Sequence, residues 1–306
     1  MKAVVLAYHN MGITGLDALF NHGFEIAAIF THEDDPGENC WFGSVKDWAI
    51  QRGISFYTTE NINSEEWIEK ITALKPDILF SFYYRKMIGK KILDIPRLGA
   101  MNLHGSLLPA YRGRCPVNWV IIKGEQKTGV SLHYMVEKPD AGDLVGQREV
   151  LIGPDDTAQT LYDKLCDAAG VLLDNVLPFI KKEQIPRTKQ DLSKGSYFGG
   201  RRPEDGRIDW KQSAGDIYNL IRAVTDPYPG AFTILANGQP VKILWAKPVS
   251  PLPGKTPGDI FLSDQDVLVQ TGNGAIRLCE IEVHGKRLRN QLIHDLFKSG
   301  KVIKLL

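Results

Sequence analysis

Apolar runs that are typical of buried strands alternate with helix-like segments along the first two thirds of the chain. The runs at 4–8, 26–31 and 78–83 are almost continuously apolar, as in strands that are buried on both faces of a sheet. Because strand and helix alternate, the pattern predicts a parallel sheet with helices on both faces. The further elements expected here are helices at 16–21, 45–51, 64–74 and 157–180, and strands at 98–103, 130–135 and 144–151.

The pattern changes in the last third of the chain, where the predicted elements become short strands. A polar stretch at 181–206, rich in Lys, Arg, Gly and Asp, is the best candidate for a linker. Short strands that follow one another at close spacing predict a small β-barrel. They are expected at 231–235, 241–247, 267–270 and 275–283, between helices at 213–224 and 289–298. We therefore expect two domains, of residues 1–203 and 204–306.

Composition and charge are those of a soluble globular protein. The 306 residues are 43% hydrophobic and 24% charged, and the formal net charge is +1. So small a net charge gives no overall basic field that would attract nucleic acid. No run is long and apolar enough to span a bilayer, and the four cysteines are widely spaced, without a zinc motif or a disulfide pattern. These features predict a cytoplasmic protein without membrane insertion and leave the oligomeric state open.

Asn102 and His104 stand at the end of the strand expected at 98–103. Because side chains alternate along a strand, both point the same way at a carboxyl end, where open α/β sheets bind their ligands. Asp140, in a turn of a later loop, would complete the set by orienting the imidazole and favouring its charged form. An amide donor, a proton carrier and a carboxylate suit acyl transfer. Taken alone, the same residues also fit a structural histidine and an ordinary turn.

The segment after the first strand lacks a dinucleotide fingerprint. It contains only Gly12 and Gly15 of a Gly-x-Gly-x-x-Gly pattern, so NAD binding is not predicted. A helix that begins there either receives an anion at its N-terminus or forms a simple strand-to-helix turn, and both interpretations stay open. The histidines form no metal-spaced cluster, and asparagine is a poor ligand for transition metals. No metal is predicted.

Four motifs in one region resemble the folate-dependent formyltransferase family. They are Asn-Leu-His-Gly-Ser-Leu-Leu-Pro at 102–109, Tyr-Arg-Gly-Arg-Cys-Pro at 111–116, Thr-Gly-Val at 128–130 and Asp-Ala-Gly-Asp at 140–143. That family includes methionyl-tRNA formyltransferase, glycinamide ribonucleotide transformylase and the sugar N-formyltransferases. The resemblance implies a Rossmann-like catalytic domain followed by a small OB-like β-barrel. It also implies that Asn102, His104 and Asp140 are the catalytic residues.

The resemblance further implies a formyl donor and the residues that bind it. The donor of the family is 10-formyltetrahydrofolate, a cosubstrate, and the formyl group passes to an amine. The positions that match the family's folate contacts are Lys86, Met87, Ile88, Arg114, Val136, Glu137, Lys138, Pro139 and Asp140. A flat heteroaromatic ring in a mostly apolar slot with few polar partners is physically reasonable for these residues.

Two further similarities indicate the acceptor amine. The opening at 7–12 and the short acidic loop at 32–39 resemble the UDP-4-amino-4-deoxy-L-arabinose formyltransferases, which serve lipid A modification and polymyxin resistance. The tRNA enzymes typically carry a basic insertion in that loop, whereas an acidic loop would repel phosphate. The resemblance therefore implies a UDP-linked amino sugar and a folate as partners, and no nucleic acid.

Other functions stay open at this point. A methionyl-tRNA formyltransferase would need a basic face, and another nucleotide-sugar N-formyltransferase would differ only in its acceptor. The candidates for a basic face are Lys286, Arg287, Arg289, Lys298, Lys301 and Lys304. A hydrolase would release formate from the same folate by using water in place of the amine. A non-catalytic folate- or nucleotide-binding protein would leave the three polar residues without a chemical role.

Overall fold

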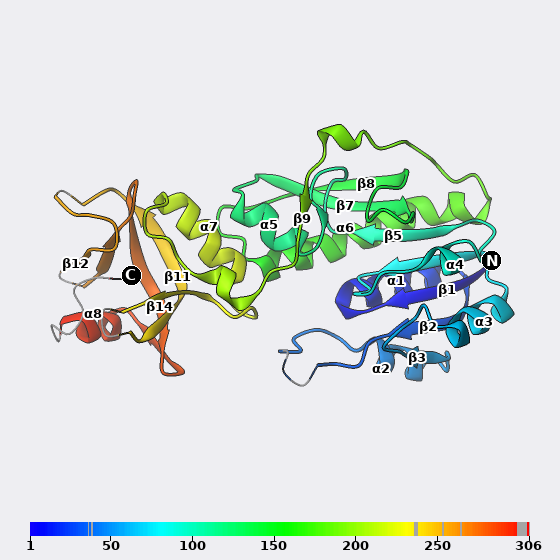
Figure 1. Cartoon of the computed structure of the whole chain (residues 1–306), viewed down its shortest axis with the longest axis horizontal. Coiled ribbons are helices and arrows are strands. Elements are labelled where there is room, and N and C mark those ends of the chain that lie inside the picture. Colours follow the sequence, from blue (N-terminus) through cyan, green and yellow to red (C-terminus); the bar gives the residue numbers. More distant parts are fainter. Residues whose placement is uncertain are drawn as a thin grey trace. The chain divides into compact units, whose positions relative to one another are not determined.

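A computed structural model describes residues 1–35, 37, 39–235, 238–252, 254–263, 265–298 and 305 of the chain. The described residues form two compact units (Figure 1). The N-terminal unit comprises Met1–Pro116, Lys127–Leu151 and Tyr162–Gly199, and the C-terminal unit comprises Val117–Gln126, Ile152–Leu161 and Gly200–Leu306. The last crossing between the units follows Gly199, close to the predicted domain boundary between residues 203 and 204, which stays a prediction.

The N-terminal unit is built on a seven-stranded sheet of order β3-β2-β1-β4-β5-β7-β8. Its strands are β1 (Lys2–Ala7), β2 (Glu25–Thr31), β3 (Phe56–Thr58), β4 (Ile78–Phe82), β5 (Ala100–His104), β7 (Lys127–Tyr134) and β8 (Leu144–Leu151). From β3 to β5 all neighbours pair in parallel, which confirms the predicted α/β class. The strands β7 and β8 are antiparallel, since the short connection between them permits only a hairpin.

Helices cover both faces of this sheet because side chains alternate along its buried strands. Val4 and Leu6 of β1 point to the face where Ile71 and Ile92 of two short helices complete a hydrophobic cluster. On the other face α1 approaches β4 so closely that a Cβ atom at Gly15 would lie 2.2 Å from the Phe82 ring. The helices of this unit are α1 (His9–Asn21), α2 (Val45–Gln51), α3 (Glu65–Leu74), α4 (Lys90–Leu93) and most of α6 (Ala158–Lys181).

The C-terminal unit contains a six-stranded antiparallel sheet, which confirms the β-rich unit predicted for the last third of the chain. The order is β10-β11-β14-β13-β12, with β15 paired to β14. The strands are β10 (Ala231–Ile234), β11 (Pro240–Val249), β12 (Ile260–Leu262), β13 (Val267–Gln270), β14 (Ala275–Val283) and β15 (Lys286–Arg289). The helices are α5 (Pro116–Ile122), α7 (Ala214–Val224) and α8 (Gln291–Lys298), and η2 (Pro203–Gly206) is a short 3₁₀ turn.

The polar stretch at 181–206 is not a free linker, because its residues 181–199 belong to the N-terminal unit and its residues 200–206 to the C-terminal unit. It holds the 3₁₀ turn η1 (Leu192–Lys194) and the strand β9 (Tyr197–Phe198), which pairs in parallel with β6 (Arg112–Gly113). Hydrophobic periodicity does not reveal such a segment, because its bonds are made by backbone and polar side chains. Among the helices of the described residues, none is long and apolar enough to cross a membrane.

Candidate active site

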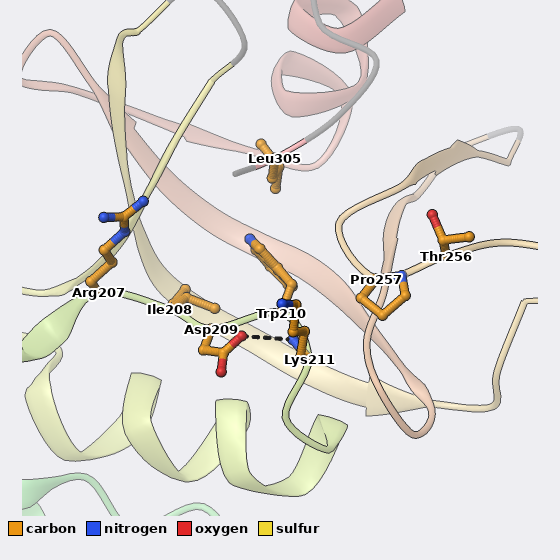
Figure 2. Close-up of a pocket in the computed structure, with 8 residues that line it drawn as sticks. All are labelled: Arg207, Ile208, Asp209, Trp210, Lys211, Thr256, Pro257 and Leu305. Atoms are coloured by element: carbon orange, nitrogen blue, oxygen red, sulfur yellow. Dashed lines mark hydrogen bonds between the residues drawn. The ribbon is translucent and has the colours of Figure 1, made fainter.

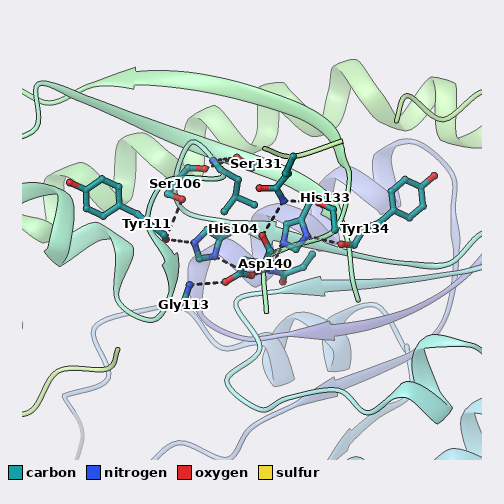
Figure 3. A network of polar contacts seen from close by, with 12 residues as sticks. His104, Ser106, Tyr111, Gly113, Ser131, His133, Tyr134 and Asp140 are labelled. Atoms are coloured by element: carbon teal, nitrogen blue, oxygen red, sulfur yellow. Dashed lines mark hydrogen bonds and ion pairs between the residues drawn. The ribbon is translucent and has the colours of Figure 1, made fainter. Parts of the chain in front are cut away.

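Asn102 and His104 lie on β5 and face the same side of the sheet, as predicted. The antiparallel register sets Asn102 opposite His133 and His104 opposite Ser131 on β7. The loop between β7 and β8 then returns Asp140 to the same place (Figure 3). Asp140 Oδ1 lies 3.6 Å from His104 Nδ1 and 3.5 Å from Asn102 Nδ2. The structure therefore brings together the three residues selected from the sequence.

Both ring nitrogens of His104 face acceptors. Its Nε2 lies 2.8 Å from the carbonyl oxygen of Tyr111, which can only accept, so Nε2 carries a proton. Its Nδ1 faces the Asp140 carboxylate at 3.6 Å. A carbonyl on one side and a carboxylate on the other complement a ring that is protonated on both nitrogens. The side chain is only 7% exposed, so water screens this interaction little.

The Asp140 carboxylate is kept in its charged form. Burial alone would raise its pKa, but the charge of His104, a hydrogen bond and the charge from His133, and the amide of Gly113 together outweigh burial. The Gly113 N–H donates to Asp140 Oδ2 at 2.8 Å. The pKa of Asp140 therefore lies well below its usual range, so it acts as a fixed negative charge and not as a proton donor.

His133 joins this group, although the sequence analysis does not select it. It is 2% exposed, and its Nε2 lies 3.4 Å from Asp140 Oδ1 and 3.3 Å from Asn102 Nδ2. Its Nδ1 donates to the Tyr134 carbonyl at 2.8 Å, because that oxygen can only accept. Its position two residues beyond Ser131 in an apolar strand looks like a core residue, and only the register of β5 against β7 shows otherwise.

Comparison with models of protein families shows to which family the chain belongs. A family model described as formyl transferase matches residues 4–177, and one described as the formyl transferase C-terminal domain matches residues 201–293. The chain belongs to the formyl transferase family. The enzyme is therefore a formyltransferase, as the motifs around residues 102–143 predict.

Solved structures share the fold of this formyltransferase at low sequence identity. An N-formyltransferase from Helicobacter canadensis, in complex with folinic acid and dTDP-3-aminofucose, is 21% identical with a TM-score of 0.72, over 91% of this chain and 98% of that one. WlaRD, a sugar 3N-formyl transferase solved with dTDP and 5-N-formyl-THF, is 22% identical with a TM-score of 0.69, over 91% and 97%. HypX from Aquifex aeolicus, in complex with tetrahydrofolic acid, is 19% identical with a TM-score of 0.61, over 94% of this chain and 46% of that one.

The residues expected to contact a folate lie on three segments, at 86–88, at Arg114 and at 136–140, and differ in what their side chains do. Lys86 Nζ bonds the Glu60 carboxylate at 3.0 Å and the carbonyl of Thr59 at 3.3 Å, and Ile88 is packed in the core. The Ile88 side chain is therefore closed to a ligand, whereas that of Lys86 remains 33% exposed. Met87 and Val136 are instead exposed, by 59% and 43%, which leaves their apolar side chains accessible to a ligand.

The remaining expected contacts lie at the surface of the same unit. Arg114 Nη2 donates to the Arg85 carbonyl at 3.4 Å. Lys138 is exposed and Pro139 half-buried in the loop that leads to Asp140. Val136 and Glu137 border a cavity of about 770 Å³ that also reaches Tyr134 and Lys90.

The N-terminus of α1 has its backbone donors occupied. The amide of Asn10 bonds His9 Nδ1 at 3.0 Å, and the amide of Met11 bonds the Tyr162 hydroxyl at 2.8 Å. The amide of Gly12 bonds the Tyr8 carbonyl at 3.1 Å. Of the two interpretations left open by the sequence, the structure therefore favours a strand-to-helix turn over an anion site.

A second cavity, of about 620 Å³, lies in the C-terminal unit and is shown in Figure 2. Arg207, Asp209, Lys211 and Trp210 contribute to its wall, and no residue selected from the sequence as catalytic or folate-binding lines it. Trp210 is 4% exposed, and its indole N–H donates to Thr233 Oγ1 at 3.0 Å, so it serves the core of this unit. Among the described residues, no group of three or more His, Cys, Asp or Glu is placed to hold a metal ion.

Proposed function

We propose that this formyltransferase transfers a formyl group from 10-formyltetrahydrofolate to the 4-amino group of UDP-4-amino-4-deoxy-L-arabinose. The observation that carries the proposal is the convergence of Asn102, His104 and Asp140 at the carboxyl end of β5. The folates and amino sugar nucleotides named with structures of the same fold support a folate donor and a sugar acceptor. The choice of UDP and of arabinose rests on the motif resemblance.

The three side chains would act on the formyl group in one arrangement. As the neutral amine adds to the formyl carbon, its oxygen becomes negative, and the Asn102 amide and the His104 imidazolium donate hydrogen bonds to it. The C–N bond to the acceptor forms and the C–N bond to the folate breaks. His104 passes a proton to the departing folate nitrogen, and the proton lost by the amine replaces it. Asp140 orients the imidazole and favours its protonated form before and after this transfer.

We assign the folate slot to the loops at 86–88 and 136–140, with Arg114 beside them. The exposed side chains of Met87 and Val136 supply apolar surface for a flat ring. The backbone of residues 86 and 88 supplies polar contacts, since the side chains of Lys86 and Ile88 are engaged elsewhere. The backbone around Pro139, next to Asp140, brings this slot to the catalytic group.

A sugar acceptor fits the charge of the described surface better than a tRNA does. The described part of the loop at 32–39 carries Glu33, Asp34 and Asp35 and no cation except by protonation of His32. In the C-terminal unit Arg287 makes a double contact with Asp226, at 2.8 and 2.9 Å, and Arg289 pairs with Glu280 at 2.7 Å. Cations with acidic partners are poor phosphate ligands. Lys301 and Lys304 lie outside the described residues.

The proposal includes the compartment and the domain boundary. The four cysteines form no disulfide with one another, which supports a reducing cytoplasm. We take residues 1–203 as the catalytic domain and 204–306 as the OB-like domain, as the match of the C-terminal family model from residue 201 supports.

The decisive experiment offers 10-formyltetrahydrofolate with two competing acceptors, UDP-4-amino-4-deoxy-L-arabinose and methionyl initiator tRNA, and follows both products by mass spectrometry. We expect formylation of the sugar alone. Formylation of the tRNA alone would contradict the proposal, and formate release that needs no acceptor would indicate a hydrolase. A dTDP-linked amino sugar in a third tube separates the proposed acceptor from other nucleotide sugars.

The same assay tests the catalytic assignment. His104→Ala should lower kcat by about two to four orders of magnitude, since it removes a proton carrier and an oxyanion donor. His22→Ala, at a half-buried histidine that pairs with Asp174, serves as the matched control and should retain activity. An unchanged kcat in His104→Ala would exclude the mechanism.

A further inference from the structure

The segment that follows α6 crosses both loops of the active site. We call residues 187–198 the strap. Near its start, Thr188 and Leu144 exchange backbone hydrogen bonds of 2.7 and 2.9 Å. At its end, Ser196 and β9 lie against the loop at 109–114, where Arg114 N–H donates to the Phe198 carbonyl at 2.9 Å. The strap therefore touches the loop that carries Asp140 and the loop that holds His104.

Gln190 fixes the backbone on which Asp140 stands. Its side chain is 7% exposed, and its Nε2 donates to the carbonyls of Asp140 at 3.0 Å and Gly142 at 2.6 Å. Asp140 has a φ of +52°, a left-handed conformation that costs energy for a residue with a side chain. A Cβ atom at Gly142 would lie 2.0 Å from the Tyr134 carbonyl, so this turn is closely packed. Two hydrogen bonds from a buried amide oppose its relaxation.

Gln190 does this at a cost in its own hydrogen bonding. Its Oε1 is buried and has no hydrogen-bond partner among the described residues. A buried acceptor without a partner is unfavourable, so the amide is held in place by the two bonds that Nε2 makes. The bridge at Thr188 and the side-chain cap from Asp191 to Ser193 restrain the chain on either side of Gln190.

Ser196 fixes the other half of the centre. Its Oγ accepts from the Tyr111 amide at 2.8 Å, and its amide donates to the Pro109 carbonyl at 3.2 Å. Tyr111 also has a left-handed φ, of +57°, and its carbonyl accepts the hydrogen bond from His104 Nε2. Ser196 therefore bonds the amide of Tyr111. The carbonyl of the same residue accepts from the His104 imidazole, as Figure 3 shows.

We propose that the strap positions the ion pair of His104 and Asp140, with Gln190 and Ser196 as its positioning residues. Neither side chain contacts His104 or the Asp140 carboxylate directly; each acts through a backbone group in a left-handed conformation. The inference rests on the proposed function only in that it assumes catalytic roles for the two residues that are positioned.

The test compares Gln190→Met and Ser196→Ala with matched controls. Gln270→Met is the control for the first, because Gln270 is also 7% exposed and donates to two carbonyls, of Thr271 and Gly274, in the C-terminal unit. Ser213→Ala is the control for the second, because Ser213 also accepts from one backbone amide, of Asp216, there. Each control removes the matching bonds and one more, from the Leu252 amide to Gln270 Oε1 or from Ser213 Oγ to Asp216 Oδ2, so it disturbs the protein at least as much. Only the strap variants touch the active-site loops.

We expect each strap variant to lower kcat about tenfold and to change KM for the acceptor by no more than about twofold. An effect of this size fits the loss of one or two neutral hydrogen bonds that maintain the geometry of the reacting groups. The controls should keep kcat and lose only thermal stability. Gln190→Glu adds a pH test: its ionised carboxylate would face two carbonyls, whereas its protonated form regains one donor. Its kcat relative to the wild type should therefore rise as the pH falls.

A second readout does not depend on any acceptor. In NMR spectra of the free protein with ¹⁵N-labelled histidine, Ser196→Ala should shift or broaden the resonance of His104 Nε2–H. In spectra with ¹³C-labelled aspartate, Gln190→Met should shift the resonance of the Asp140 carboxyl group. Unchanged resonances, or the same loss of kcat in the controls, would overturn the proposal. A wild-type protein that formylates no nucleotide sugar would overturn the proposed function instead, and the resonances would still decide the role of the strap.

Discussion

A single carboxylate, Asp140, gathers most of the polar contacts of the active site. It faces His104, His133 and Asn102 through one oxygen and receives the Gly113 amide on the other. The charges and hydrogen bonds that lower its pKa, against the effect of burial, also make it a source of folding stability. The same interactions that hold the candidate active site together thus make its stability depend on pH.

We expect this contribution to disappear in acid. A carboxyl whose folded pKa is depressed stabilises the protein fully above its unfolded pKa of about 4, and the contribution is lost as the pH falls toward the folded value. The free energy of unfolding of the wild type should therefore fall below about pH 4, and that of Asp140→Asn should fall less steeply. Urea denaturation from pH 3 to pH 6 measures both; parallel curves would contradict the expectation.

The pKa of His9 predicts a second range of pH, above the first, in which the stability of the protein changes. Burial and, to a smaller extent, the charge of Arg85 together lower the pKa of His9 to about 3. Between the unfolded pKa of about 6.5 and the folded value, only the unfolded chain takes up this proton, so stability is lost as the pH falls through that range. His9→Asn, in which asparagine tolerates the left-handed φ of +67°, should flatten the curve between about pH 6 and 4.

The two variants serve as controls for each other, because each is expected to change stability in a different range of pH. Burial and nearby cations also lower the pKa of His32, to about 4, so His9→Asn should reduce the slope in this range and not abolish it. Asp140→Asn should leave the slope above pH 5 unchanged. If His9→Asn keeps the full slope of the wild type, the ring of His9 is protonated in the folded state. Its aromatic neighbours Trp41 and Phe42 would then not prevent its protonation.

At the scale of elements, the sheet carries the site because β5 lies between parallel and antiparallel neighbours. Its parallel partner β4 belongs to the βα units, and its antiparallel partner β7 turns back at once to present Asp140. The close packing of α1 on β4 at Gly15 supports this arrangement.

Gly15→Ala should therefore destabilise the protein. The new methyl group would lie 2.2 Å from the Phe82 ring, and overpacking of this kind costs about 1–3 kcal/mol or more. Gly170→Ala on α6 is the control, since its methyl group would meet only the Thr14 side chain, at 3.7 Å. There the gain in helix propensity should stabilise the protein by about 0.5–1 kcal/mol. Thermal unfolding of both variants, with the opposite signs expected, checks the packing of α1.

Sequence patterns predict some of these elements well and others not at all. Apolar runs locate the strands β1, β2 and β4, and alternation places Asn102 and His104 on one face, because both signals are local. The strap has no such signal: Gln190 and Ser196 act through hydrogen bonds to residues about 50 and 85 positions away. His133 is hidden for a similar reason, since its partners become visible only through the register of β5 against β7.

At the scale of the whole molecule, acidic and basic residues are mixed along the chain and are not collected in separate regions. Their charges nearly cancel, which leaves a net charge of +1. In the C-terminal unit Arg287 and Arg289 pair with Asp226 and Glu280, and Lys242 pairs with Glu282 at 3.1 Å. A surface of this kind offers little long-range attraction to a polyanion, whereas it does not hinder a ligand with two phosphates.

This charge pattern predicts a weak dependence of acceptor use on salt. Each phosphate that cations neutralise contributes a slope of about −0.7 to −0.9 to a plot of log affinity against log salt concentration, so a diphosphate sugar should give a slope no steeper than about −2. A tRNA held through six or more phosphates would give about −4 or steeper. Measuring kcat/KM for the sugar acceptor between about 50 and 400 mM KCl checks the first slope, and parallel assays of Lys242→Ala, which frees Glu282, report whether the C-terminal unit contributes. A slope clearly steeper than about −2 for the wild type would contradict the prediction, because the cations of the protein can neutralise only the two phosphates that this ligand carries.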